Sequence, residues 1–300
     1  MLKTTVLSAA LLMLAAGSYA QEASDPVWPP PVDLFDSGRL LATQGVSQIE
    51  GSAGGGLVPW AVISGYGTRD AIGASGHYTF VSLNDFRVHS AGLSVGLFNR
   101  LELSYSHLWF DTQKVGTTLG LGKDFKFEQN VIGAKLRLLG DIVYDQDSLL
   151  PQISIGAQYK ISEDSDVLRL IGAKDNRGLD FYASATKLFL SESLLLNATV
   201  RMTKANQFGF LGFGGDRRDA YRPQLEASAA YLITKNLALG GEYRMKPDNL
   251  KFAKEENAYD VFLAYFINKN ASLTLAYANL GRIATRDTQS GIYASLQIGF

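Results

Sequence analysis

The sequence predicts an all-β fold: a transmembrane antiparallel up-and-down β-barrel of about 14 strands, with 12 strands as the alternative. From about residue 47 onward, apolar side chains recur at every second position, as in strands with two different faces. Short turns alternate with longer polar loops, as in outer-membrane barrels. Aromatic side chains fall at both ends of the apolar face, where the two membrane interfaces would lie.

Residues 1–20 have the pattern of a secretory signal peptide. Lys3 precedes an apolar stretch over residues 6–16, and small residues up to Ala20 suit cleavage there. The apolar stretch is shorter than the roughly 20 residues that a membrane helix needs, and no longer one follows it. We therefore expect export, cleavage near Ala20 and a location in the outer membrane of a Gram-negative cell.

Residues 21–46 form a separate, proline-rich segment. Pro26 and the prolines at 29–31 surround Trp28, and proline is excluded from central strands. We predict a periplasmic N-terminal segment, either a loose leader or a chain partly docked in the lumen, followed by the barrel over residues 47–300.

The strand pattern is clearest near the C-terminus, where Leu273, Leu275 and Tyr277 share one face of a predicted strand. It is least clear in the first four strands, where Pro59 and the glycines at 54–56 interrupt it. The predicted strands are 47–54, 57–66, 75–83, 86–97, 101–111, 125–138, 150–161, 179–190, 194–204, 221–232, 237–245, 257–267, 271–280 and 291–300.

The connections predict the direction of each strand. Short turns at 98–100, 191–193, 234–236 and 268–270 are predicted to be periplasmic; long loops at 112–124, 162–178, 205–220, 246–256 and 281–290 are predicted to be extracellular. These directions place outward aromatic residues in two girdles, Trp109, Tyr159, Tyr243 and Tyr277 at the outer interface and Phe189, Tyr231 and Tyr265 at the periplasmic one.

The alternate positions of the same strands carry charges that are predicted to face the lumen. They are Glu102, Lys135, Arg137, Lys160, Arg201, Glu226, Glu242, Arg244 and Asp260. Two interpretations stay open: a pore lining that sorts small hydrophilic solutes by charge, or a salt-bridge network that fills a narrow barrel. A channel is the main functional hypothesis, and a non-conducting structural or surface-binding barrel is the alternative.

Composition argues against several other classes. The 28 basic and 29 acidic side chains give a net charge of −1, which does not favour a nucleic-acid partner. The chain has no cysteine and three histidines, without metal-ligand spacing, so no metal site, cofactor or catalytic residue is predicted. A hydrolase is the least favoured hypothesis, because His107 and Ser106 are neighbours and point to opposite faces of a strand.

The glycine-rich 205–220 loop has two possible interpretations. The favoured one is a tight extracellular surface loop, and the other is a loop that folds into the lumen and narrows it.

The last strand ends on Phe300 with apolar residues at every second position before it. It resembles the signal that outer-membrane barrels present to the barrel-assembly machinery. The chain also resembles an uncharacterised, broadly porin-like family of proteobacterial outer-membrane proteins, known as a domain of unknown function. The similar stretches are residues 45–51, 144–148, 150–153, 155–160, 203–209, 211–216, 246–250 and 283–287. This resemblance implies an outer-membrane barrel and implies no substrate.

Overall fold

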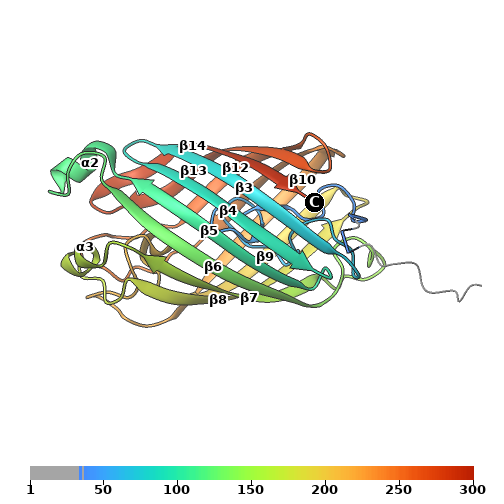
Figure 1. Cartoon of the computed structure of the whole chain (residues 1–300), viewed down its shortest axis with the longest axis horizontal. Helices are drawn as coiled ribbons and strands as arrows, with labels where there is room; N and C mark the ends of the chain where they lie inside the picture. The colour runs from blue at the N-terminus through green and yellow to red at the C-terminus, as the bar shows by residue number, and fades with distance from the viewer. Residues whose placement is uncertain (1–33, 36) are drawn as a thin grey trace, which may run out of the picture. The chain divides into compact units, whose positions relative to one another are not determined.

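The described part of the computed structural model, residues 34, 35 and 37–300, forms one closed barrel of 12 strands. Each strand pairs antiparallel with its neighbours in sequence, and β14 pairs with β3 to close the ring, as Figure 1 shows. Closure leaves no strand edge unpaired. The strands are β3 (Ile72–Leu83), β4 (Arg87–Leu97), β5 (Leu101–Asp111), β6 (Lys126–Leu139), β7 (Gln152–Ser162), β8 (Arg177–Phe189), β9 (Leu194–Thr203), β10 (Arg222–Thr234), β11 (Leu237–Arg244), β12 (Ala258–Phe266), β13 (Ala271–Ile283) and β14 (Arg286–Gly299).

The two ends of the barrel differ in their connections. At the loop end, long segments carry α2 (Gln113–Thr118), α3 (Ser165–Leu170) and the 3-10 turn η1 (Asn206–Gly209). At the turn end the connections are short, except for residues 140–151. Among the described residues, no helix has the length and apolar character needed to cross a membrane.

The prediction of a long loop at 281–290 is wrong. β13 and β14 extend through most of it and meet at residues 284–285, where Ala284 takes a φ of 51°. The longer paired strands satisfy backbone groups that a loop would have left to solvent.

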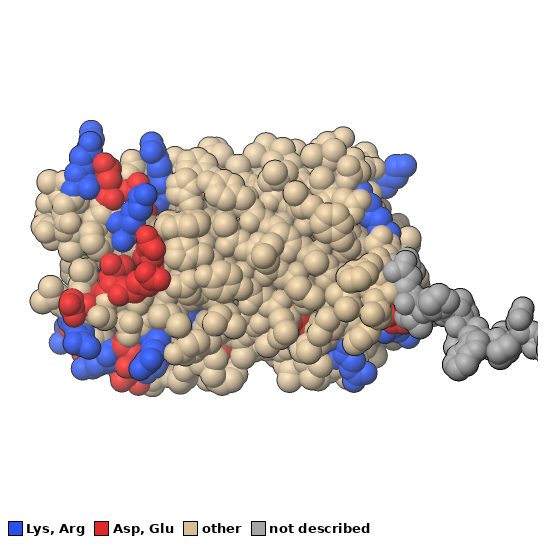
Figure 2. All heavy atoms as spheres, viewed as in Figure 1, with Lys and Arg blue, Asp and Glu red and all other residues tan. Residues whose placement is uncertain are grey.

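Alternation sets the two faces of the wall. Along β12, Tyr259, Val261 and Leu263 are exposed, whereas the intervening Asp260 and Phe262 are buried. In Figure 2 the middle of the visible outer surface carries almost no charge, and lysine, arginine and carboxylate side chains gather at its two ends. The outer face of the wall is thus an apolar band between two polar margins.

The predicted count of 14 strands is wrong, and the alternative of 12 is correct. Segments 47–54 and 57–66 do not enter the wall. This part of the chain carries β1 (Val46–Ser47) and β2 (Ala53–Gly54), which pair with each other in a separate two-stranded sheet. Residues 43–66, here called the plug, are buried throughout and lie inside the barrel, where Figure 1 shows them in blue.

The plug packs so closely against the wall that side chains are excluded at some positions. A Cβ atom on Gly55 would lie 2.0 Å from Oε1 of Glu242, a residue of β11. The glycines that blurred the strand pattern in the sequence are therefore positions of close backbone approach. The proposed signal peptide and most of the 21–46 segment lie outside the described residues.

Candidate functional site: the plugged lumen

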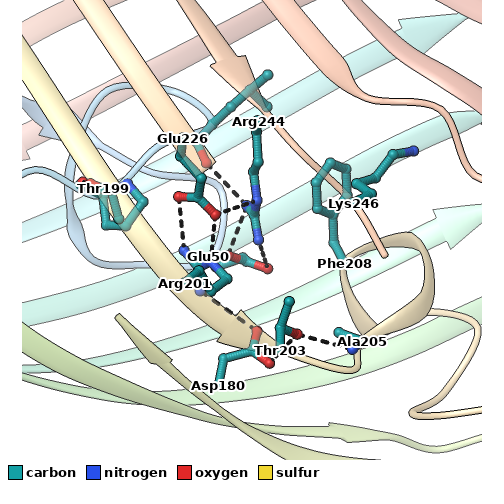
Figure 3. Close-up of polar contacts among 12 residues, drawn as sticks. Glu50, Asp180, Thr199, Arg201, Thr203, Ala205, Phe208, Glu226, Arg244 and Lys246 are labelled. Atoms are coloured by element: carbon teal, nitrogen blue, oxygen red, sulfur yellow. Dashed lines mark hydrogen bonds and ion pairs between the residues drawn. The ribbon is translucent and has the colours of Figure 1, made fainter. Parts of the chain in front are cut away.

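An ion-pair network at the centre of the lumen joins the plug to the wall (Figure 3). Glu50, at the tip of the β1–β2 hairpin, places its Oε1 atom 2.5 Å from Nζ of Lys160 on β7. Its Oε2 atom lies 3.0 Å from a guanidinium nitrogen of Arg244 on β11. All three side chains are almost fully buried. One plug carboxylate therefore bridges two cations from distant parts of the wall.

The wall completes this network with its own carboxylates. Nζ of Lys160 lies 2.8 Å from Asp180 on β8. Arg201 on β9 lies 2.5 Å from Glu226 on β10 through Nε, and the Nε atom of Arg244 approaches the same Glu226 oxygen at 3.3 Å. The three cations thus face Glu50, Asp180 and Glu226, which offsets the cost of burying each charge.

A second ion pair clamps the two arms of the plug. Glu102 accepts hydrogen bonds from the backbone N–H groups of Ala53 (3.1 Å) and Ser64 (2.9 Å). Lys135, 3.2 Å from Glu102, donates to the carbonyls of Ala53 and Val62, both at 2.8 Å. These charged side chains take the place of water around the buried plug backbone.

Glu242 holds the plug from another side of the lumen. It accepts hydrogen bonds from the Leu57 N–H (2.6 Å) and the Ser228 hydroxyl (2.9 Å). Asp260 sits directly opposite Glu242 in the β11–β12 ladder, and its Oδ1 atom has no hydrogen-bond partner among the described residues. Two carboxyl groups thus face each other here.

Neutral wall side chains bind the remaining plug backbone. The carbonyl of Ala61 accepts hydrogen bonds from Gln152 and Ser154, both at 2.6 Å, and its N–H donates to Thr186 at 2.7 Å. The carbonyl of Pro59 accepts hydrogen bonds from Ser184 (3.1 Å) and Thr199 (2.9 Å). These contacts tie the plug to β7, β8 and β9.

At the turn end the plug is held by Arg39, which precedes it in the chain, and by Phe300, which follows β14. Arg39 donates to the carbonyls of Ile63 (2.7 Å), Gly65 (2.8 Å) and Thr43 (2.6 Å), and burial lowers the pKa of Arg39 to about 10. The carbonyl of Phe300 accepts the N–H of Tyr66 at 2.7 Å. The last residue of the barrel therefore holds the end of the plug.

At the loop end, residues 205–215 fold inward over the plug. Lys160 donates to the carbonyl of Phe208 at 3.3 Å, and the guanidinium of Arg244 lies 4.4 Å from the centre of the Phe208 ring. Gln207 and Phe208 take positive φ values of 44° and 62° to make this turn. The favoured interpretation of 205–220 as a plain surface loop is therefore wrong for 205–215, because these residues lie mostly buried in the mouth of the lumen.

A buried polar cluster pins this inward loop. Gln207 donates to Glu255 at 2.8 Å, and Lys246 lies 3.1 Å from Glu255. Burial lowers the pKa of the Lys246 ammonium and raises the pKa of the Glu255 carboxyl. The attraction between the two charges opposes both shifts.

The structure brings most of the predicted lumen residues together. All nine are buried. Eight of them belong to the ion pairs and carboxylate contacts described above. Arg137 lies apart from these, near the turn end, and pairs with Asp141 at 2.9 Å. Sequence reasoning missed Glu50 and Asp180. The alternation of β8 puts Asp180 on the buried face and could have identified it. The alternation pattern does not identify Glu50 as a lumen residue, because it predicts a wall strand for the segment that contains it.

The predicted girdle residues lie on the outer face at two levels. Tyr243 pairs with Tyr259, and Tyr277 with Val261, toward the loop end. Tyr265 pairs with Leu237, and Tyr231 with Leu194, toward the turn end. The tyrosines among the predicted residues are exposed, and Trp109 and Phe189 are half-buried.

His77 and His107 take part in structural contacts on opposite faces of the wall. Nε2 of His77 lies 3.1 Å from Oγ of Ser90, but both are buried, and Ser90 donates to the plug carbonyl of Ile49 at 2.6 Å. This pair anchors the plug. On the outer face His107 contacts Asn130 (2.9 Å) and Glu128 (3.4 Å), neither of which supplies a nucleophilic hydroxyl. Within the described residues, no group of three His, Cys, Asp or Glu side chains could hold a metal ion.

The chain is similar to several solved structures and matches one family model. No curated protein matches the sequence significantly. The KdgM porin is 13% identical, with a TM-score of 0.48, covering 75% of this chain and 99% of that one. The NanC porin is 11% identical, with a TM-score of 0.48 and coverage of 76% and 99%. The outer membrane phospholipase A from Escherichia coli is 10% identical, with a TM-score of 0.44 and coverage of 75% and 92%.

A family model matches residues 43–297, a range that includes the plug and almost the whole barrel. The matched range covers most of the chain, as the sequence resemblance implied. The chain belongs to the family described as "Protein of unknown function (DUF3034)".

Proposed function

We propose that this protein is a porin-like barrel of the outer membrane whose pore is closed at rest by residues 43–66. The observation that carries the proposal is the position of Glu50, buried in the lumen between Lys160 and Arg244. The contacts around it are polar, so water and ions can replace them when the plug moves. The wall left behind would be lined by charges of both signs, as in pores for small hydrophilic solutes.

The outer face supports the membrane location. Exposed aliphatic side chains such as Leu263 and Leu275 occupy the middle of the wall, and tyrosines flank them. In hydrocarbon, every backbone polar group needs a partner, and a closed barrel provides one for each. The proposed partners are the lipid of the outer membrane and the barrel-assembly machinery. The machinery would bind the C-terminal strand and the Phe300 that follows it.

Conductance in planar bilayers tests the proposal. Wild-type protein is expected to be mostly closed with rare openings, and Glu50→Gln to open more often because the plug loses its charge contacts. A variant lacking residues 44–64 is expected to open more often than Glu50→Gln, because only the inward 205–215 loop then remains in the lumen. Glu192→Gln, in an exposed turn, is the matched control and should behave as wild type.

A non-conducting barrel is the second candidate, favoured by the many hydrogen bonds that hold the plug backbone. Silent wild-type and Glu50→Gln proteins, beside a conducting deletion variant, would assign the protein to this class. A correctly folded variant that lacks both residues 44–64 and the inward 205–215 loop and still does not conduct would reject the channel altogether.

A further inference from the structure

The lumen is not polar along its whole length. At the turn end, between the plug and strands β8–β12, lies a cavity of about 300 Å³. Its wall is formed by inward-facing apolar residues, among them Leu188, Leu195, Phe262 and Phe266, where the central lumen carries charges. The plug closes the cavity from above with Val46 and Trp60.

The cavity has an outlet at the turn end. Its deep lining residues, such as Leu188 and Phe262, are buried, whereas Leu40 and Leu190 at its edge are about half exposed (54% and 46%). Among the described residues that line it, the one charged side chain is Lys235, which is exposed in the β10–β11 turn. Within residues 34, 35 and 37–300, Lys235 has no ion-pair partner.

We propose that this cavity binds a straight-chain fatty carboxylate, with its alkyl chain among the apolar wall residues and its head group at Lys235. An empty apolar cavity destabilises a fold in proportion to its volume, and dry apolar cavities bind apolar molecules. The volume lies at the lower end for small-molecule sites, which suits one alkyl chain better than a two-chain lipid. Lys235, the one cation among the described lining residues, complements a single negative head group at the outlet.

This site differs from the apolar cavity of about 130 Å³ at the loop end. The described residues that line that cavity, such as Phe86, Phe210 and Ile283, include no charged side chain. That smaller cavity gives no basis for choosing a head group. The turn-end site is also independent of whether the barrel conducts, because ligand binding there does not require the plug to move.

Quenching of Trp60 by brominated fatty acids tests the proposal. The protein is placed in nanodiscs of zwitterionic lipid, with Trp28→Phe and Trp109→Phe leaving Trp60 as the single tryptophan. Quenching is expected to saturate, and affinity to rise about fourfold for each added CH₂ until the cavity is full. The matching brominated alcohols are expected to bind more weakly.

Two pairs of measurements decide the result. Ala230→Phe, which fills the cavity, is expected to remove saturable quenching, whereas Ala229→Phe, its neighbour on the outer face, is expected to keep it. Heat-modifiable migration on gels checks that both variants fold. Lys235→Gln is expected to weaken binding of carboxylates about tenfold and to leave alcohols unchanged.

Three results would overturn the proposal. Quenching that rises linearly and equally in both alanine variants would show partition into the bilayer only. An equal loss of carboxylate and alcohol binding in Lys235→Gln would remove the head-group assignment. Binding that appears only after deletion of residues 22–33 would show that this segment of the chain occupies the cavity itself.

Discussion

Glu50 Oε1 and Lys160 Nζ lie 2.5 Å apart in the centre of the lumen, although 110 residues separate them in the chain. Both side chains are fully buried. The bond therefore connects the plug to the wall at a point that solvent does not reach, and it orients the hairpin tip toward β7.

Removing the charge of Glu50 should loosen the plug. In Glu50→Gln, Lys160 and Arg244 lose a buried counter-charge, and we expect the free energy of plug opening to fall by about 3 kcal/mol. Native-state hydrogen exchange of amides in residues 47–62 measures it. Glu192→Gln should change it by less than about 0.5 kcal/mol. Unchanged exchange in Glu50→Gln would show that the ion pair contributes little to closure.

The outer face should resist charge most strongly near its middle. Leu275 pairs with Leu263 at the centre of the apolar band, so Leu275→Arg is expected to lower folding stability in lipid by about 2–4 kcal/mol. Thr288→Arg, on the exposed β13–β14 hairpin, should cost about 1 kcal/mol or less. Urea titration of the protein in thin bilayers compares them. Equal costs would mean that the apolar band is not in contact with hydrocarbon.

The 140–151 connection should open in acid. Burial alone would raise the pKa of Asp141, but hydrogen bonds from the N–H groups of Tyr144 (3.0 Å) and Val143 (2.9 Å) and from Arg137 (2.9 Å) outweigh it and lower that pKa below 3.8. A lowered carboxyl pKa stabilises the folded loop above pH 3.8, and this stabilisation is lost as the pH falls through the folded-state value.

Limited proteolysis with an acid-stable protease across this pH range checks the prediction. Cleavage within 140–151 should increase as the pH falls below about 3.8 in the wild type. Asp141→Asn should be cleaved readily at every pH. Arg69, whose guanidinium lies 3.8 Å from Asp141, is exposed, and its replacement by Gln should change the profile only slightly.

The inward fold of the 205–215 loop should depend on Gly209. Its φ is 109°, and an added Cβ would lie 2.2 Å from Nε2 of Gln129 and 3.0 Å from the Phe213 ring. Gly209→Ala is therefore expected to release this loop toward solvent and to make it protease-sensitive. Gly120 also has a positive φ, 75°, but an added Cβ there would meet no atom of the described residues within 4 Å, so Gly120→Ala should cost only about 1 kcal/mol of backbone strain. Equal protease sensitivity in the two variants would assign the effect to backbone strain and not to the contact with Gln129.

The period-two alternation predicted the wall well. Residues such as Leu275 and Asp260 take their faces from local geometry, because successive side chains of a strand point to opposite sides. The same alternation could have placed Asp180 inside. The corresponding twelve predicted strands lie within a few residues of β3–β14, apart from the extension of β13 and β14 into a predicted loop.

Residues 47–66 show why the alternation was not enough. A segment with mixed polar and apolar residues has the same local pattern in a wall and inside a lumen, since both environments present polar and apolar surfaces to it. The inner volume of a 12-stranded barrel, which side chains alone do not fill, decides between them. The sequence by itself determined which side chains face outward and which face inward along each wall strand. Only the tertiary structure decided that Glu50 joins Lys160 and Arg244, because these residues meet when the ring of strands closes around the plug.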